Sequence, residues 1–388
     1  AAHKRRIYLA GWQAKIRKIK GFIMSFNALQ IGKHKVKYPI IQGGMGLGIS
    51  WDRLASAVSL NGGLGVISSV GTGYYENRSH IKKELNAKPY GSENFYSREG
   101  LNAVITNARK VCGNAPLGCN ILCASNDYAR IAHDACEVGF NVIISGAGLP
   151  TNLPEFTQDF PEVALVPIVS SAKALKIICK RWQTRYNRLP DAVVVEGPKS
   201  GGHQGFTYEQ CLDANYQLEA ILPSVVAEAK EWGDFPIIAA GGVWDKKDIE
   251  TMLNLGASGV QMGTRFIGTY ECDASDEFKS VLLACKKEDI ELIHSPVGYP
   301  ARGVRTNLLN LVDKRMGPKI NCISNCVTPC GRGKGANEVG YCIADRLFDA
   351  YFGRKDTGLF FTGANGWRLD KLISVKELME KLVNGENS

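Results

Sequence analysis

Eight short apolar runs, each leading into a loop rich in glycine, asparagine or serine, constrain the fold of this chain more than any other feature. Stretches with the apolar spacing of a helix separate most of them. Runs that are apolar on both faces are typical of parallel strands covered by helices, and eight such strand-helix units predict a closed (β/α)8 TIM barrel. The expected strands are residues 38–42, 64–69, 116–122, 141–145, 163–169, 191–195, 236–242 and 259–266.

The 388 residues allow three parts. We expect a basic N-terminal arm over 1–24 that is disordered or not native, the barrel over 25–285 with an insertion at about 71–115, and a C-terminal segment over 286–388 that contains a cysteine module. An open dinucleotide-binding sheet fits less well. Neither glycine-rich stretch of the chain has the spacing G-x-G-x-x-G at a strand-to-helix turn.

The net charge of +9 lies largely in the N-terminal arm, which carries seven Lys and Arg residues and no acidic residue. Such an arm can bind nucleic acid or lipid but is more often disordered, so we expect no nucleic-acid partner. Its apolar residues are interrupted every few positions by Lys or Arg, which excludes a signal-peptide core. No run elsewhere reaches the roughly 18 apolar residues of a membrane span. The sequence therefore predicts a cytoplasmic protein and leaves homo-oligomerisation open.

The loop after the sixth expected strand carries a histidine among glycines. Gly201 and Gly202 let the backbone approach a flat or phosphorylated ligand, and His203 can take or give a proton near neutral pH. Active sites of repeating β/α folds collect at the C-terminal ends of the strands, where such loops meet. A histidine satisfied inside a tight turn is the alternative. The glycines and the strand end favour a catalytic acid or base at His203.

Glycines at the ends of three other strands predict the ligand. They belong to a set that comprises Gly44, Met45, Gly46, Gly241, Gly242, Gly263 and Thr264. The pairs after the seventh and eighth strands stand where barrels commonly bind a phosphate through backbone N–H groups and a hydroxyl. The stretch after the first strand lets the backbone lie against a flat ring. The set indicates flavin mononucleotide (FMN), although a sugar phosphate substrate would use the same phosphate pocket.

Four motifs resemble those of the nitronate monooxygenase (2-nitropropane dioxygenase) family of FMN barrels, which also contains NADH-dependent enoyl-ACP reductases, where ACP is the acyl carrier protein. The motifs are residues 38–45 (YPIIQGGM), 196–203 (EGPKSGGH), 239–242 (AAGG) and 261–266 (QMGTRF). The resemblance implies that His203 is the catalytic acid or base. The FMN contacts that it implies are Asn120, Glu196, Gly201, Gly241, Gln261, Met262, Gly263 and Thr264.

Four cysteines form a second constellation, with the spacing C-x3-C-x3-C-x11-C. They are Cys322, Cys326, Cys330 and Cys342. Thiolates are soft ligands, and four of them from a glycine-rich loop can hold an iron-sulfur cluster or a zinc ion. Zinc knuckles usually have the spacing C-x2-C, so the wider spacing favours a [4Fe-4S] cluster over zinc or no metal. The other eight cysteines are expected to be small core residues rather than disulfides.

The span from about residue 31 to 382, which includes this cysteine module and the stretch 361–366 (FTGANG), closely resembles the FMN and [4Fe-4S] acyl-ACP dehydrogenase/isomerases of bacterial unsaturated fatty acid synthesis. That resemblance implies oxidation of a saturated acyl-ACP, decanoyl-ACP, to the trans-2-enoyl form and isomerisation to the cis-3-enoyl form. The implied partner is an acyl carrier protein, with O2 as a candidate electron acceptor. A nitronate monooxygenase, an NADH-dependent enoyl-ACP reductase and a non-enzymatic redox sensor are the alternatives.

Overall fold

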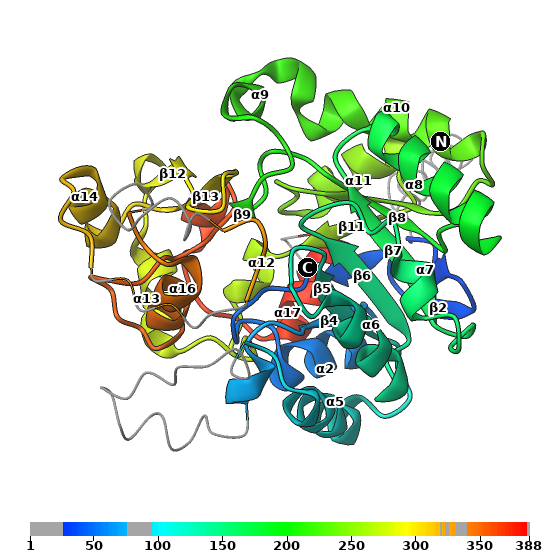
Figure 1. The fold of residues 1–388 in the computed structure, drawn as a ribbon, viewed down its shortest axis with the longest axis horizontal. Helices are drawn as coiled ribbons and strands as arrows, with labels where there is room; N and C mark the ends of the chain where they lie inside the picture. The colour runs from blue at the N-terminus through cyan, green and yellow to red at the C-terminus, as the bar shows by residue number, and fades with distance from the viewer. Residues whose placement is uncertain are drawn as a thin grey trace, which may run out of the picture.

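The structure is a computed structural model that describes residues 26–75, 95–318, 320, 322, 326–330 and 340–385 (Figure 1). The predicted N-terminal arm, and residues 76–94 of the predicted insertion, lie outside these residues. None of the helices in the described part of the chain has the length and apolar content needed to cross a membrane.

Eight parallel strands form the barrel that the sequence predicts (Figure 1). In chain order they are β3 (Ile40–Gln42), β4 (Gly65–Ser68), β5 (Leu117–Leu122), β6 (Val142–Gly146), β7 (Ala164–Val169), β8 (Val193–Glu196), β10 (Ile237–Ala240) and β11 (Gly259–Met262). Neighbours pair in parallel from β3 through β11, β10, β8, β7, β6 and β5 to β4. An isolated parallel bridge between Ile41 and Leu64 joins the two ends. The predicted (β/α)8 architecture is therefore confirmed.

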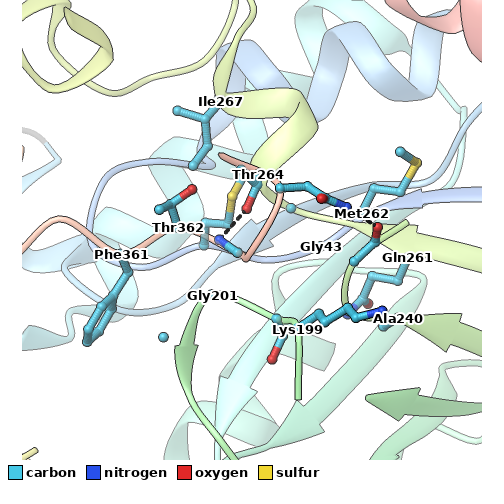
Figure 2. A pocket seen from close by; sticks show the side chains of 18 of the residues that line it. Gly43, Lys199, Gly201, Ala240, Gln261, Met262, Thr264, Ile267, Phe361 and Thr362 are labelled. Atoms are coloured by element: carbon cyan, nitrogen blue, oxygen red, sulfur yellow. Dashed lines mark hydrogen bonds between the residues drawn. The ribbon is translucent and has the colours of Figure 1, made fainter. Parts of the chain in front are cut away.

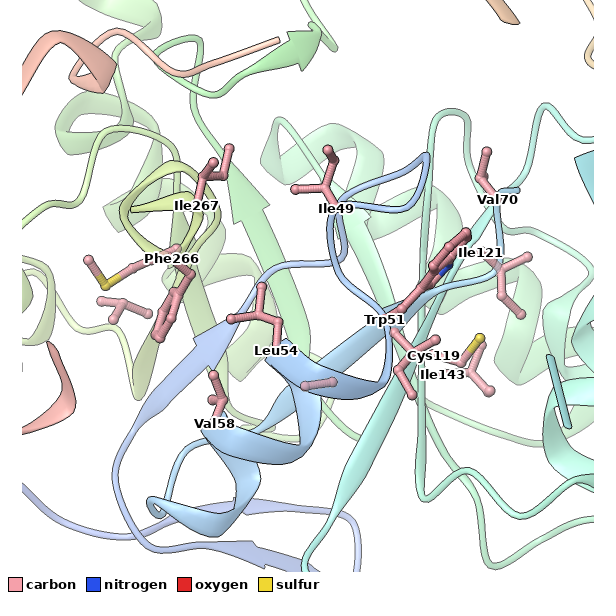
Figure 3. Close-up of a cluster of buried hydrophobic side chains, with 14 of the residues drawn as sticks. Ile49, Trp51, Leu54, Val58, Val70, Cys119, Ile121, Ile143, Phe266 and Ile267 are labelled. Atoms are coloured by element: carbon pink, nitrogen blue, oxygen red, sulfur yellow. The ribbon is translucent and has the colours of Figure 1, made fainter. Parts of the chain in front are cut away.

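Strand residues alternate between two buried layers. Ile41, Val66 and Val194 belong to an interior layer, which also takes in residues of the hairpin formed by β1 (Leu29–Ile31) and β2 (His34–Val36). The outer layer packs strands against helices. Figure 3 shows part of this layer, where Leu54 extends from the first barrel helix. Since the hairpin contacts residues near the start of β7, the opposite rim is left for ligands.

The helices after the barrel strands are α2 (Asp52–Leu60), α5 (Arg98–Cys112), α6 (Tyr128–Glu137), α7 (Leu153–Phe156), α8 (Ala172–Tyr186), α9 (Tyr208–Leu212), α10 (Leu218–Lys230), α11 (Lys246–Asn254) and α12 (Thr264–Ile267), with 3-10 turns η1 (Thr72–Tyr74) and η2 (Ala214–Tyr216). The predicted insertion contains α5, which packs on α2. The start of α2 is capped from far along the chain, because the Asp273 carboxylate accepts the backbone N–H groups of Trp51 (2.8 Å) and Leu54 (3.1 Å).

The C-terminal segment packs beside and onto the barrel mouth (Figure 1). Helix α13 (Asp276–Ala284) ends the barrel region. The elements of the C-terminal segment are η3 (Lys287–Asp289), β12 (Ile290–His294), β13 (Pro300–Val304), α14 (Asn307–Asp313), α16 (Ile343–Tyr351), η5 (Gly366–Arg368) and α17 (Val375–Asn384). A three-stranded antiparallel sheet places β13 between β12 and β9 (Gly202–His203). The loop that carries the predicted catalytic histidine is therefore paired with a strand about a hundred residues further on.

The single cysteines behave as the sequence predicts. Of the eight outside the constellation, seven are buried and only Cys123 is partly exposed. Burial raises the pKa of the Cys136, Cys179 and Cys272 thiols to about 12, so they stay protonated and unreactive at neutral pH.

Candidate active site

One cavity opens where the barrel strands end (Figure 2). Its walls come from the loops after β3, β8, β10 and β11 and from residues 361–365 of the C-terminal segment. The empty volume is about 980 Å³, including space open to solvent. Twelve of the thirteen residues predicted to bind the cofactor line it, namely Gly44, Met45, Gly46, Glu196, Gly201, Gly202, Gly241, Gly242, Gln261, Met262, Gly263 and Thr264.

Glycines begin the loops after β10 and β11 and form a cradle, beside which Val243 and Trp244 also line the cavity. Gly241 and Gly242 have φ angles of +97° and +96°, a left-handed conformation that favours glycine. A Cβ atom on Gly241 would lie 2.5 Å from the carbonyl oxygen of Gly197. Thr264 then supplies a hydroxyl at the start of α12. Such a cradle of backbone and one hydroxyl suits a phosphate group.

Residues 361–365 form a wall of the cavity that sequence reasoning did not assign to the site. The Gly363 N–H donates to Oγ1 of Thr264 (2.8 Å), and Nδ2 of Asn365 donates to the carbonyl oxygen of Gly242 (2.6 Å). A Cβ atom on Gly201 would lie 2.7 Å from the carbonyl carbon of Thr362, so this glycine permits close packing of the wall. The stretch FTGANG was the only signal, because its partners lie 99 and 123 residues away.

Two buried polar atoms in the cavity wall have no hydrogen-bond partner within the described part of the chain. They are Oε1 of Gln261 and Oγ1 of Thr362. Leaving such atoms unpaired is costly, so a polar ligand is expected to satisfy them. A flat ring with polar edges joined to a phosphate satisfies the glycine cradle and these two atoms together. The residues present therefore fit FMN.

Glu196 ends β8 and lines the same cavity. Burial raises the pKa of its carboxyl to about 7, so a large fraction is neutral at physiological pH and can donate a hydrogen bond. Lys199, another wall residue, pairs with Glu219 (3.7 Å). The cavity thus contains the Glu196 carboxyl, with a pKa near 7, and the Lys199 ammonium group, which forms an ion pair with Glu219.

His203 lies behind the cavity wall rather than in it. Its ring packs edge-on against Phe361, a wall residue, with ring centroids 5.5 Å apart. A hydrogen bond of 2.7 Å joins Nε2 to the hydroxyl of Ser295, on the turn between β12 and β13. Burial lowers the pKa of the imidazole to about 4, so the ring is neutral at pH 7 and can accept a proton. The Ser295 partner was not expected from the sequence, since only the pairing of β9 with β13 brings it near.

Asn120, the remaining residue predicted to bind the cofactor, lies beneath the loop after β3. Its Nδ2 donates to the carbonyl oxygen of Ile144 (3.3 Å). A Cβ atom on Gly44 would lie 2.2 Å from Cβ of Asn120, so the two residues are in close contact. Asn120 therefore supports the loop that lines the cavity and is not itself among the lining residues.

The four constellation cysteines share one electrostatic neighbourhood at the barrel mouth. Burial is the largest cause that raises the pKa of the Cys326 thiol to about 11, and the charges of Cys342, Cys330 and Cys322 contribute to this rise. Their segment is attached to the loop after β5, where the Asn126 N–H donates to the Cys326 carbonyl (3.2 Å). No three of these thiols lie within 4.8 Å of one another in the described structure. The other three thiols are thus near enough to Cys326 to influence its pKa, although no three of the four described thiols meet the 4.8 Å criterion.

The barrel and its cavity are those of a (β/α)8 protein whose barrel mouth fits a flat, phosphorylated ligand. The family model for nitronate monooxygenase matches residues 27–385. The chain therefore belongs to the nitronate monooxygenase family and is a flavin-dependent oxidoreductase, and membership implies FMN as the flavin.

Curated relatives carry two kinds of name. The chain is 28% identical to a nitronate monooxygenase of Pseudomonas aeruginosa, over 69% of this chain and 77% of that protein. It is 29% identical to a 5-hydroxy-7a-methyl-1-oxo-octahydro-1H-indene-4-carboxyl-CoA dehydrogenase of Rhodococcus jostii, over 72% of this chain and 65% of that protein. The chain therefore spans slightly less than two thirds of the length of the second relative.

Solved structures show the same fold. FabK from Thermotoga maritima is 24% identical with a TM-score of 0.68, covering 91% of this chain and 93% of that one. A nitroalkane oxidase from Streptomyces ansochromogenes is 19% identical with a TM-score of 0.64, covering 90% of this chain and 96% of that one. At these identities the likeness concerns the fold alone.

Proposed function

We propose that this enzyme oxidises a saturated medium-chain acyl-ACP, decanoyl-ACP, to the trans-2-enoyl thioester and isomerises it to the cis-3-enoyl thioester. The observation that carries the proposal is the position of His203, a neutral imidazole packed on the wall of a cavity that fits FMN. An uncharged ring close to the cofactor cavity suits the removal of a weakly acidic proton next to a thioester carbonyl. The relative named as a carboxyl-CoA dehydrogenase supports thioester oxidation within the family.

In this proposal, some residues of the chain bind the cofactor and His203 transfers protons. FMN, when bound, supplies the oxidant that accepts the hydrogen and electron pair lost from the β-carbon. The glycine loops after β10 and β11, with Thr264, would hold its phosphate, and Gln261 and Thr362 its polar edges. His203 takes the α-proton. After oxidation the ring gives this proton up to solvent. In the isomerisation it then takes the γ-proton and delivers that same proton to the α-carbon, while the hydrogen bond between Nε2 and the Ser295 hydroxyl keeps the ring in place.

An anaerobic titration of the FMN-loaded protein with decanoyl-ACP tests the proposal. Flavin absorbance should fall with substrate, and the product should contain the cis-3-enoyl thioester. Replacement His203→Ala should lower the reduction rate by about 10² to 10⁴-fold with FMN retained. The matched control is His133→Ala, because His133 lies on α6 with a side chain that is 46% exposed. An unchanged rate in His203→Ala would remove this residue as the base.

A nitronate monooxygenase is the second candidate, because the family model and the Pseudomonas aeruginosa relative carry that name. The same base would serve in that chemistry. Oxygen consumption with an alkyl nitronate, together with no bleaching by decanoyl-ACP, would replace the first proposal by this one. Rapid flavin reduction by NADH would instead indicate an enoyl-ACP reductase.

We also propose a [4Fe-4S] cluster at the four constellation cysteines. A zinc ion with Zn–S bonds of about 2.3 Å requires its four sulfurs within about 4 Å of one another, whereas a larger cluster separates them further. The electrostatic influence of the other three thiols on Cys326 supports one common ligand set, and the wide C-x3-C-x3-C spacing favours the larger group. Iron and acid-labile sulfide should be present in the purified protein and lost in Cys326→Ser, whereas Cys285→Ser, which alters a cysteine outside the constellation, should retain them. Stoichiometric zinc without iron would overturn this assignment.

A further inference from the structure

A second cavity lies beside the first and is formed by two short segments. Residues 205–210, which lead into α9, form one side, and residues 294–300, the turn between β12 and β13, form the other. Its empty volume is about 910 Å³, including space open to solvent. Of the residues that line it, the proposed reaction uses only Ser295, which holds the His203 ring.

His203 touches a wall residue of each cavity. Its ring packs on Phe361 of the cofactor cavity, and its Nε2 is bonded to Ser295, which lines the second cavity. The backbone on either side is fixed as well, because His203 pairs with Ala301 and the N–H of Gln204 donates to the Pro300 carbonyl (2.8 Å). A substrate atom within reach of His203 is therefore close to both cavities.

The lining of the second cavity is polar and aromatic. Tyr208 and His294 stack with their ring centroids 5.0 Å apart, and Tyr299 presents an exposed ring beside them. Thr207, Gln210 and Ser295 add hydrogen-bonding groups, and no Asp, Glu, Lys or Arg occurs among the described residues that line it. Such a surface suits a neutral chain with amide groups. A phosphate would require cations here, and a bare hydrocarbon chain would require a closed apolar pocket.

We propose that this second cavity binds the pantetheine arm of the acyl thioester. The inference rests on the proposed function, which supplies a thioester substrate. The acyl chain then extends over the cofactor cavity, the reacting carbon lies at His203, and the amide-bearing arm runs out to solvent between residues 205–210 and 294–300. The same arm occurs in ACP and in coenzyme A, so the cavity recognises the arm common to both carriers.

The test separates arm binding from chemistry. Binding of S-methylpantetheine to the FMN-loaded protein is measured by calorimetry for wild type, Tyr299→Ala and Tyr270→Ala. Tyr270 is an equally exposed tyrosine outside both cavities (58% exposed, against 51% for Tyr299). Removal of one aromatic contact should weaken binding by about 3- to 10-fold in Tyr299→Ala and leave Tyr270→Ala at the wild-type value. Absence of binding to the wild type, or equal binding to both variants, overturns the inference.

Anaerobic flavin reduction by decanoyl-ACP, decanoyl-CoA and decanoyl-N-acetylcysteamine gives the second readout. Decanoyl-N-acetylcysteamine lacks most of the arm and should show the largest KM. Tyr299→Ala should narrow the gap between this KM and the KM values of the two full carriers. Equal KM values for all three would leave the proposed reaction standing and remove the arm site. Failure of all three to reduce the flavin, with pantetheine binding still weakened in Tyr299→Ala, would instead refute the reaction and retain the site. The better of the two full carriers identifies the source of the arm.

Discussion

His203 should make the stability of the protein fall on acidification, and the size of the effect follows from its burial. The pKa of the imidazole is lowered from 6.5 to about 4 by burial. The unfolded chain therefore binds the proton more readily than the folded protein between these two values. Stability contributed by the neutral ring is present above about pH 6.5 and is lost as the pH falls towards 4.

The magnitude is limited by the partial exposure of the ring. A shift of one pKa unit corresponds to about 1.4 kcal/mol, so full expression of this shift would give about 3 kcal/mol. Because the His203 side chain is partly accessible, screening by solvent lowers the expected effect to about 1 to 3 kcal/mol at about pH 4.5. This is a measurable part of the stability of a typical domain.

The pH dependence of stability is measured by urea unfolding at about pH 4.5 and about pH 7.5. The proteins compared are the wild type, His203→Asn and His133→Asn. Between the two pH values, the wild type should lose about 1 to 3 kcal/mol more stability than His203→Asn, which has no ring to titrate. The His133→Asn variant, changed at a histidine whose side chain is 46% exposed, should follow the wild type. Parallel pH curves for wild type and His203→Asn would refute the buried, neutral imidazole on which the proposed chemistry depends.

Three further predictions concern the cavity and the barrel. Gly241→Ala forces a Cβ to 2.5 Å from a backbone oxygen at a φ of +97° and should abolish FMN binding in fluorescence titrations; retained affinity would exclude the proposed cradle. In the wild type, FMN affinity should fall as the pH rises through about 7, because Glu196 becomes charged, and Glu196→Gln should flatten that dependence; an unchanged dependence points to another group. Asp273→Ala leaves N–H groups at the start of α2 unpaired and should lower the free energy of unfolding in urea by about 1 to 2 kcal/mol. An unchanged free energy of unfolding would contradict the cap.

The barrel could be predicted because each of its strands leaves a local pattern. The stretch 191–195 was expected as a buried strand, and β8 runs from Val193 to Glu196. The glycines after β10 and β11 could be placed for the same reason, since a strand end fixes where its loop emerges. Local sequence patterns were therefore sufficient to predict the architecture and most of the residues that line the cavity.

The arrangement around His203 could not be predicted, because it depends on pairing between distant segments. β9 has only two residues and owes its position to β13, and Ser295 reaches the ring from 92 residues away. Neither contact leaves a periodic signal. Phe361 lies between the histidine and the cavity for the same reason, because its segment is placed by hydrogen bonds and a bridge to distant parts of the chain.

The pairing of β9 with β13 has a consequence for engineering this enzyme. A chimaera that kept the barrel and exchanged the C-terminal segment for that of a relative would retain the glycine cradle after β10 and β11 but would replace the neighbour that orients His203. Residues 200–210 and 290–304 should therefore be transplanted as one unit, since each half supplies what the other lacks. Inheritance of specificity in this family is then expected to follow that paired unit more closely than the barrel itself.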